Sequence, residues 1–146
     1  MTGARIRPAR PDDAPDLAPL TTQLGYPVDP AEQSRRLAAI LGSDDEVVLV
    51  AVDASDAPIG WIHVQDCRSM TSPRHAQIAG MVVDEAHRSA GAGARLLAAA
   101  EAWAGERGLP SVQVHSRVER EGAHRFYERH GYELVKTSRV LQRRIG

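Results

Sequence analysis

The sequence predicts a mixed α/β (α+β) fold, with a central sheet of about six to seven strands flanked by about four helices. Three observations lead to this prediction. Apolar runs of strand length alternate with longer segments whose apolar residues recur at helical spacing. The length of 146 residues suits one compact domain, and the composition, 42% apolar and 25% charged, is that of a globular protein. We therefore expect residues 1–146 to form a single domain.

The first elements predicted are a strand at 6–9 and a helix with apolar residues at helical spacing, Leu17, Leu20 and Leu24. Asp12 and Asp13 precede this helix and are candidate caps. Pro19 lies inside the helix and lacks a backbone donor, so the helix is expected to kink or break there.

A second helix is expected to begin after Asp29, which is a typical cap, with Pro30 in its first turn. Glu32 stands where a capping-box side chain reaches back to the start of the helix. Gly42 is a suitable end for this helix.

Three strands follow, at 47–52, 59–64 and 78–83, and are expected to pair as antiparallel hairpins. The first is almost continuously apolar, as in a strand that is covered on both faces. The polar stretch 65–75 between the second and third strands is predicted to be a loop.

The chain then alternates between helices and strands. A helix at 92–107 is followed by a strand at 112–114 and a helix at 121–130. Two further strands are predicted at 132–136 and 139–143. The arginines near the end alternate with apolar residues, which favours an edge strand with one wet face over a basic binding patch.

Composition excludes several functions. The net charge is −1, with 18 basic and 19 acidic side chains, so there is no large positive field for nucleic acid or an anionic membrane, and a small-molecule partner is favoured. Cys67 is the single cysteine, which fits a reducing cytoplasm and excludes an internal disulfide. No apolar run approaches the ~20 residues of a membrane span, and no leader pattern opens the chain. The histidines have no ligand spacing with Cys67, so no metal is predicted.

The most informative segment runs from the strand at 81–83 through Arg88-x-x-Gly91-x-Gly93 into a helix. A helix N-terminus offers unpaired N–H groups and about half a positive charge, and glycines let a pyrophosphate approach the backbone. A P-loop would end in Gly-Lys-Ser/Thr, where this chain has Gly-Ala-Arg95. A dinucleotide fingerprint would need a third glycine at Leu96.

Two blocks resemble the GNAT acyltransferase superfamily. Val83-Asp-x-x-x-Arg88-x-x-Gly91-x-Gly93, followed by a Leu-Leu helix, resembles the coenzyme A signature of that family. Ala-x-x-Phe-Tyr-x-x-x-Gly-Tyr at 123–132 resembles a second block of the family, which has phenylalanine at its end. The opening Ile-Arg-Pro-Ala and the order of elements also agree, so the resemblance covers nearly the whole chain.

The resemblance implies that acetyl-CoA is the co-substrate. The backbone of the strand would pair with the pantetheine arm like an added strand, and the following loop would hold the pyrophosphate. The implied coenzyme residues are Met81, Val82, Val83, Arg88, Ser89, Ala90, Gly91, Ala92, Gly93 and Ala94, with Tyr127 near the sulfur. Arg88 would act through its backbone, and the alternative is a simple surface residue.

Attack on a thioester requires a neutral amine, and an amine of pKa ~10.4 loses its proton at pH 7 at a cost of roughly 4 to 5 kcal/mol. Family members that modify histones carry a base glutamate at the position matching Gln77, and an amide cannot take a proton. Glu85 and His115 are the substitute bases. Glu85 can equally be a solvated acid, and His115 a polar residue at a strand end.

Tyr127 is the general acid that the resemblance implies, because the corresponding tyrosine of the family points at the thioester sulfur. With a phenol pKa of about 10 and a thiol pKa of about 8.5, full proton transfer is uphill by about 2 kcal/mol, so a hydrogen bond to the thiolate suffices. A core tyrosine beside Phe126 is the alternative. Arg120 stands where the family frequently has an asparagine. Unlike asparagine, an arginine side chain cannot accept hydrogen bonds.

The sequence therefore predicts an N-acetyltransferase that acts on a primary amine of a small molecule by direct attack. The alternatives are a non-catalytic acyl-CoA sensor or partner module, and an acetyltransferase of protein lysines or N-termini. Leu24-Gly25-Tyr26-Pro27 resembles small-molecule acetyltransferases, some similar to aminoglycoside N-acetyltransferases. The acidic residues Asp44, Asp45, Glu46 and Asp66 form no large block for such a polycation. A homodimer through the C-terminal strands is common among relatives.

Overall fold

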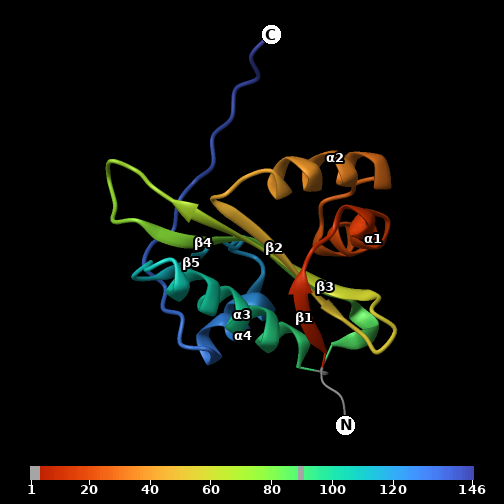
Figure 1. Ribbon diagram of the computed structural model, residues 1–146. Coiled ribbons are helices and arrows are strands. Elements are labelled where there is room, and N and C mark those ends of the chain that lie inside the picture. The colour runs from red at the N-terminus through yellow and green to blue at the C-terminus, as the bar shows by residue number, and fades with distance from the viewer. Residues whose placement is uncertain (1–3, 89–90) are drawn as a thin grey trace. The chain divides into compact units, whose positions relative to one another are not determined.

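The computed structural model describes residues 4–88 and 91–146 (Figure 1). The chain forms two compact units, Met1–His115 and Ser116–Gly146. The first unit holds the sheet and three α-helices, and the second holds one α-helix and the C-terminal segment.

Within the described residues the sheet has five strands, in the spatial order in which they follow along the chain. They are β1 (Arg5–Pro8), β2 (Glu46–Val52), β3 (Pro58–Cys67), β4 (His75–Val83) and β5 (Val112–Val114). The first four are antiparallel neighbours, and β5 runs parallel to β4. The predicted mixed sheet is confirmed, with five strands instead of six or seven.

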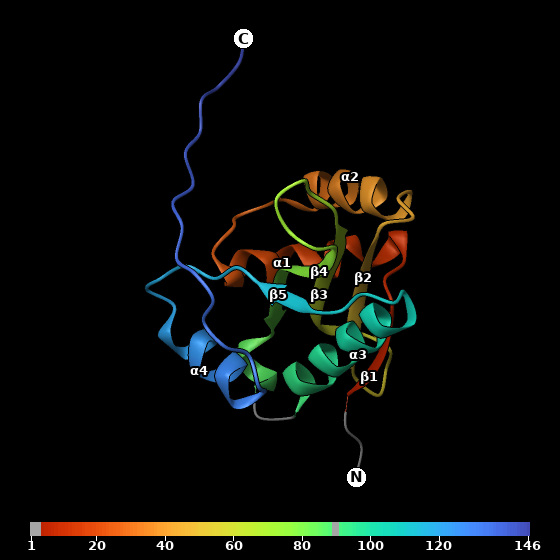
Figure 2. The ribbon, with the colours of Figure 1, turned by 90° about the vertical axis from the view of Figure 1, so that its left-hand side faces the viewer.

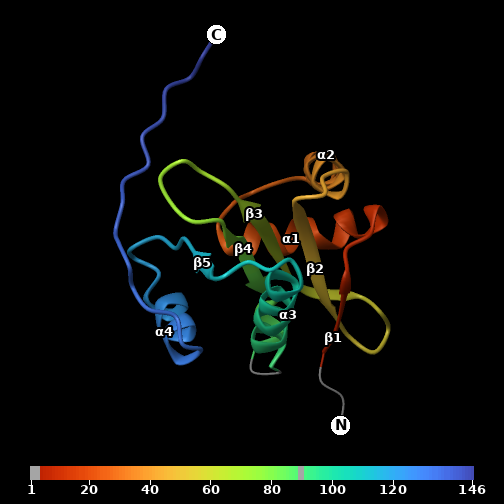
Figure 3. The same cartoon turned by 60° about the vertical axis from the view of Figure 1, so that its left-hand side comes forward.

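The helices of the first unit cover both faces of the sheet (Figures 2 and 3). They are α1 (Ala14–Leu24), α2 (Pro30–Leu41) and α3 (Ala92–Glu106), with short 3-10 turns at Pro11–Asp13 and Glu85–His87. Leucines of α1 and α2 form one apolar core with β2 and β4: Leu17, Leu20, Leu37, Val48, Val50, Val52 and Val82. On the other face, Leu96 and Leu97 of α3 are fully buried.

The caps only partly follow the prediction. Asp29 caps α2 by accepting a hydrogen bond from the Glu32 N–H at 2.8 Å, as expected. Glu32 does not reach back, because its carboxylate binds Arg35 and Arg36 in the next turn. Asp13 accepts the N–H of Arg10 but gives α1 no side-chain cap, because its carboxylate pairs with a buried arginine of β1.

The predicted break at Pro19 is wrong, because α1 is one helix of eleven residues, while the alternative, a kink, stays a prediction. A proline inside a helix removes one N–H bond, at a cost of about 3 kcal/mol. Leu17 and Leu20 flank it and are both buried in the core. Their burial offsets the missing bond and keeps the helix continuous.

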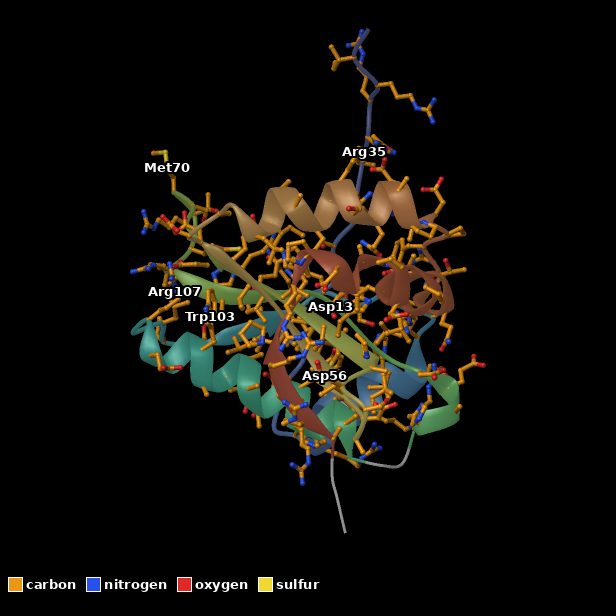
Figure 4. The ribbon with its side chains drawn as sticks, turned by 45° about the vertical axis from the view of Figure 1, so that its right-hand side comes forward. Asp13, Arg35, Asp56, Met70, Trp103 and Arg107 are labelled. Atoms are coloured by element: carbon orange, nitrogen blue, oxygen red, sulfur yellow. The ribbon has the colours of Figure 1, made fainter. Side chains whose placement is uncertain are left out.

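The loop between β3 and β4 is shorter than predicted and spans 68–74, because polar residues extend both strands. The Asp66 carboxylate, with no exposed area, accepts both Arg74 Nε at 2.8 Å and Arg107 Nε at 3.1 Å. Arg107 also lies over the Trp103 ring, 4.9 Å from its centroid (Figure 4). This ion cluster joins the β3–β4 hairpin to the end of α3. Its two arginines supply hydrogen bonds to the buried carboxylate of Asp66 in β3.

The second unit contains α4 (Glu121–Arg129), close to the predicted helix. The strands predicted at 132–136 and 139–143 are absent from the described residues. A strand forms only where its N–H and C=O groups pair with a neighbour, and no strand pairing includes this segment. Its apolar side chains are exposed: Leu134, Val135, Val140, Leu141 and Ile145.

Candidate active site

The edge of β4 is open over its second half. β5 pairs with β4 through three residues, and the last pair joins Ile78 to Val114. Beyond this pair β4 continues through 79–83 with β3 on its other side. Backbone N–H and C=O groups that face away from β3 in this stretch therefore have no strand partner among the described residues. The predicted pantetheine residues, Met81, Val82 and Val83, lie here.

A β-bulge lies where the open edge of β4 begins, directly after the last residue that pairs with β5. Gly80 pairs with His63 and Ile78 pairs with Val64, so Ala79 is an extra residue of β4. A bulge disrupts the ladder locally and re-aims backbone groups. Sequence reasoning missed it, although Gly80 inside a strand was a signal for it.

Gly80 also makes room for Trp61. A Cβ atom on Gly80 would lie 2.9 Å from Cη2 of the Trp61 ring. Trp61 belongs to β3 and packs against the apolar core under α1. The indole edge therefore crosses β4 beside the bulge, at the place where a side chain on Gly80 would stand.

The loop before α3 has the features expected of an anion site. Gly91 adopts a left-handed conformation with φ of 80°, and the first intrahelical bond runs from the Arg95 N–H to the Gly91 carbonyl at 3.1 Å. The N–H groups of Ala92, Gly93 and Ala94 precede this bond, so they have no partner within the helix. The predicted residues Ser89 and Ala90 lie outside the described residues.

Arg88 follows the 3-10 turn Glu85–His87, and its side chain is exposed. Its Nε donates to the Val83 carbonyl at 3.4 Å, which is a long hydrogen bond. That carbonyl belongs to the stretch predicted to meet the pantetheine arm. The Arg88 side chain therefore contacts the end of β4, and its predicted backbone role toward a coenzyme stays a prediction.

Gln23 fastens the end of α1 to the turn after β4. Its Nε2 donates to Asp84 Oδ1 at 3.1 Å, and its Oε1 accepts from the Glu85 N–H at 3.0 Å. Hydrogen bonds from Gln23 and from His87 lower the pKa of Asp84. This clamp fixes one end of the open edge relative to α1.

A group of polar side chains lies on the strands of the sheet, and we call it the polar strip: Glu46, His63, Gln65, Cys67 and Gln77. His63 Nε2 is 2.7 Å from Glu46 Oε1, and Gln65 Nε2 donates to the same oxygen at 3.2 Å. Cys67 Sγ donates to Gln77 Oε1 at 3.8 Å, and burial with nearby carboxylates raises the pKa of that thiol. Local sequence pattern does not predict the Glu46–His63 pair, because the two residues meet only through strand register.

The two predicted bases are both exposed. Glu85 begins the 3-10 turn after β4, and His115 follows β5. Their roles stay predictions.

Tyr127 lies in α4 and is buried, with 8% of its surface exposed. Its ring makes edge contacts with Phe126 and Tyr132, at centroid distances of 5.3 and 5.6 Å. Burial raises the pKa of Tyr127 to about 12, against a smaller lowering by Arg120. A phenol this weak as an acid can still donate a hydrogen bond. Its proposed partner, the thiolate, stays a prediction.

Two absences apply to the described residues, 4–88 and 91–146. No group of three histidine, cysteine, aspartate or glutamate side chains there could hold a metal ion. None of the described helices is long and apolar enough to cross a membrane.

Comparison with known proteins connects this geometry to a family. A model of the acetyltransferase (GNAT) family matches residues 14–132. The uncharacterized N-acetyltransferase YhfO of Bacillus subtilis is 30% identical over 133 residues, which cover 88% of this chain and 89% of that protein.

Solved structures share the fold. The aminoglycoside 6'-N-acetyltransferase AAC(6')-Ih of Acinetobacter baumannii superposes with a TM-score of 0.85 at 15% identity, over 99% of this chain and 100% of that chain. AAC(6')-Iy, in complex with the bisubstrate analogue CoA-S-monomethyl-acetylneamine, gives 0.85 at 17% identity with the same coverage.

Proposed function

Because the chain belongs to the acetyltransferase (GNAT) family and so uses acetyl-CoA, we propose that it transfers the acetyl group to a primary amine of a small molecule. The observation that carries this proposal is the open edge of β4, which leads from the bulge at Ala79 toward the N-terminus of α3. Four strand steps of about 3.3 Å separate Ala79 from Val83, or about 13 Å of free backbone.

We assign the coenzyme to this path. Met81, Val82 and Val83 would pair through their backbone with the amides of the pantetheine arm, as an added strand does. The loop from Arg88 to Ala94 would hold the pyrophosphate with N–H groups and the helix dipole. Gly91 supports this role, because its positive φ turns the chain into the helix without a Cβ atom.

The thioester would then lie beside the bulge. A backbone N–H released from the ladder there can donate to the thioester oxygen as negative charge develops on it. The amine attacks the carbonyl carbon, the C–S bond breaks, and coenzyme A leaves as a thiolate. Tyr127 would donate a hydrogen bond to that sulfur. With a pKa of about 12 against about 8.5 for a thiol, full proton transfer is uphill by about 5 kcal/mol, so the proton stays on the phenol.

A small amine with few charges fits the electrostatics best. Asp66 is neutralised by two arginines, and Asp45 pairs with Arg107 at 3.2 Å. Apart from Glu46, these ion pairs leave little free negative charge near the polar strip, and a polycation such as an aminoglycoside would need more. The two aminoglycoside acetyltransferases act on small-molecule amines, which supports the same acceptor class for this chain, without the polycation.

We also propose that the protein is cytoplasmic and forms a homodimer. The single free cysteine supports a reducing compartment. The exposed apolar side chains of the C-terminal segment support pairing with a second copy.

The test combines calorimetry with an amine panel. Titration of the protein with acetyl-CoA is expected to show micromolar binding, and a panel of primary amines is expected to release free thiol above the amine-free rate. Binding without release would indicate the sensor function. Release with lysine peptides but not with small amines would move the acceptor class to proteins. No binding at millimolar acetyl-CoA would contradict the coenzyme site.

A further inference from the structure

The polar strip contains a histidine–carboxylate pair that neither the coenzyme nor the core uses. His63 of β3 and Glu46 of β2 are joined by a 2.7 Å hydrogen bond, and their side chains are 16% and 24% exposed. Both residues are partly buried yet reachable by solvent. A reachable histidine held by a carboxylate is a common arrangement for moving protons.

Strand register places this pair beside the open edge of β4. His63 pairs directly with Gly80, and the register shift of the bulge falls between His63 and Val64. Directly paired residues on antiparallel strands have their Cα atoms about 4.5 to 5.5 Å apart, with side chains on the same face. Gly80 has no side chain, and the ring edge of Trp61, two residues before His63 on β3, lies over it. His63 therefore lies next to the backbone at which the thioester is proposed to bind.

The pair also has a defined proton arrangement. Burial disfavours the ionised Glu46, but hydrogen bonds from His63 and Gln65 outweigh it and lower the pKa of Glu46. An ionised carboxylate can only accept, so Nε2 of His63 carries the proton in this bond. The neutral imidazole then has its lone pair on Nδ1, which is the atom able to accept a proton.

Glu46 and Gln65 also connect the pair to solvent. Both line an open hollow of about 380 Å³ together with Ser43, Asp45, Asp66, Cys67 and Arg68. An amine that enters through this hollow would reach the polar strip from the end of β3.

We propose that His63, held by Glu46, is the general base that accepts the proton of the acceptor amine. This inference rests on the proposed function. The amine nitrogen bonds to the thioester carbon, its proton passes to His63 Nδ1 directly or through one water, and the C–S electron pair leaves on the thiolate. The imidazolium is stabilised by Glu46 and returns its proton to solvent or to the thiolate.

The pair fills a gap that sequence reasoning left open. Gln77 stands where related enzymes carry a base glutamate, and an amide cannot accept the proton. Gln77 belongs to the same polar strip. The carboxylate of this strip is Glu46 on β2, and His63 on β3 lies between Glu46 and β4. Among the described residues, the Glu85 side chain has no hydrogen bond to an imidazole, and the His115 side chain has none to a carboxylate.

The experiment compares His63→Gln with the unaltered protein on a series of amines of similar size. Ethylamine and its mono-, di- and trifluorinated forms have ammonium groups of steadily falling pKa, so the need for a base falls along the series. At pH 7.5 we expect His63→Gln to lower kcat by about 10²- to 10⁴-fold for ethylamine and any panel acceptor. The loss should shrink toward one for trifluoroethylamine, while calorimetry shows unchanged acetyl-CoA affinity.

The matched control is His75→Gln, which removes an exposed imidazole whose Nδ1 contacts the Pro73 carbonyl. It should retain the unaltered rate with every amine. A loss in His63→Gln that is equal for all four ethylamines, or no loss at all, overturns the base assignment while leaving the proposed function intact. An unaltered protein that releases no thiol with any amine overturns the proposed function, and the base assignment with it.

Glu46→Gln guards against a His63 variant that fails to fold. It keeps an oxygen that can accept from Nε2 but removes the charge that stabilises the imidazolium. We expect a smaller loss of kcat, again largest for ethylamine. Nitrogen-15 NMR of the imidazole should show the proton on Nε2, and a proton on Nδ1 of the neutral ring would overturn the assignment without any acceptor.

Discussion

Arg7 and Asp13 form a buried bidentate ion pair, with Nη1 2.8 Å from Oδ2 and Nη2 2.9 Å from Oδ1. Both side chains are less than a tenth exposed. Arg7 Nε also donates to Asp56 at 3.0 Å, so one guanidinium joins β1 to the turn before α1 and to the β2–β3 turn. Figure 4 labels the two aspartates, Asp13 and Asp56. Mutual hydrogen bonding raises the pKa of Arg7 and lowers that of Asp13, so both stay charged.

Breaking this pair should destabilise the fold strongly. Arg7→Met leaves the Asp13 carboxylate buried without its main partner, at a cost of about 3 to 5 kcal/mol in the free energy of unfolding. Urea denaturation measures it. Arg5→Met is the control, because Arg5 is on the same strand with an exposed side chain that also binds Asp56. Equal stability of the two variants would show that the buried pair contributes nothing of its own.

Stability should fall in acid because of Asp66. Hydrogen bonds from Arg74 and then Arg107 outweigh burial and hold the pKa of Asp66 far below its usual range. The unfolded chain then binds a proton at this site near pH 4, while the folded chain does not. The contribution is therefore complete above about pH 5 and is lost as pH falls below about 4.

Asp66→Asn should flatten this acid slope. Urea denaturation between pH 7 and pH 3 measures the slope, and Asp12→Asn, an exposed carboxylate, provides the comparison. An unchanged slope in Asp66→Asn would assign acid sensitivity to other groups.

Gly60 and Gly105 should respond to alanine with opposite signs. A Cβ atom on Gly60 would lie 2.8 Å from the Val82 carbonyl oxygen, so Gly60→Ala should cost about 1 to 3 kcal/mol. Gly105 lies in α3 with no atom within 4 Å of such a Cβ, so Gly105→Ala should stabilise the protein by about 0.4 to 1 kcal/mol. Thermal denaturation of both variants decides, and the same sign for both would refute the packing argument.

Gly91 should be essential for coenzyme binding. Gly91→Glu places a negative charge where the pyrophosphate is proposed to bind, and calorimetry should show acetyl-CoA affinity lowered by at least about 100-fold, or roughly 3 kcal/mol. Gly91→Asn is the control, because asparagine tolerates the left-handed conformation and adds no charge. Normal binding by Gly91→Glu would move the pyrophosphate elsewhere.

Tyr127→Phe should lower turnover far more than acetyl-CoA affinity. The phenol is proposed to stabilise the leaving thiolate by one hydrogen bond, and such a bond to a charged group contributes about 1.5 to 3 kcal/mol, or roughly 10- to 150-fold in kcat. Thiol release and calorimetry measure the two quantities. Equal turnover in the variant would leave Tyr127 as a buried ring of α4.

Local pattern was enough to predict most of the fold. The apolar runs around Val50 and Ile62 and the helical spacing of Leu96, Ala100 and Ala104 depend on a few neighbouring residues, and those elements are confirmed. The strands predicted in the C-terminal segment were wrong for the complementary reason. Alternating Val140 and Arg139 is compatible with a strand, but a strand also requires a neighbour that no local pattern specifies.

The local geometry of the candidate site was predictable only where it depends on neighbouring residues. Glycine spacing before α3 is local, so the turn at Gly91 was foreseen. The bulge at Ala79 and the Glu46–His63 contact depend on how β2, β3 and β4 align, and residues 17 apart give no sign of that alignment. The raised pKa of Tyr127 likewise depends on the burial of its ring, and the identity of a single residue does not predict burial.

The indole of Trp61 gives the molecule an optical reporter at its proposed reaction centre. Its Nε1 is buried without a hydrogen-bond partner among the described residues, and its ring edge lies over Gly80. The second tryptophan, Trp103, lies instead against the Arg107 guanidinium. Trp61 fluorescence should therefore lie further to the blue than that of Trp103. With Trp103 replaced by phenylalanine, the remaining emission records the polarity beside the bulge, and it should change as an acyl group or an amine arrives there.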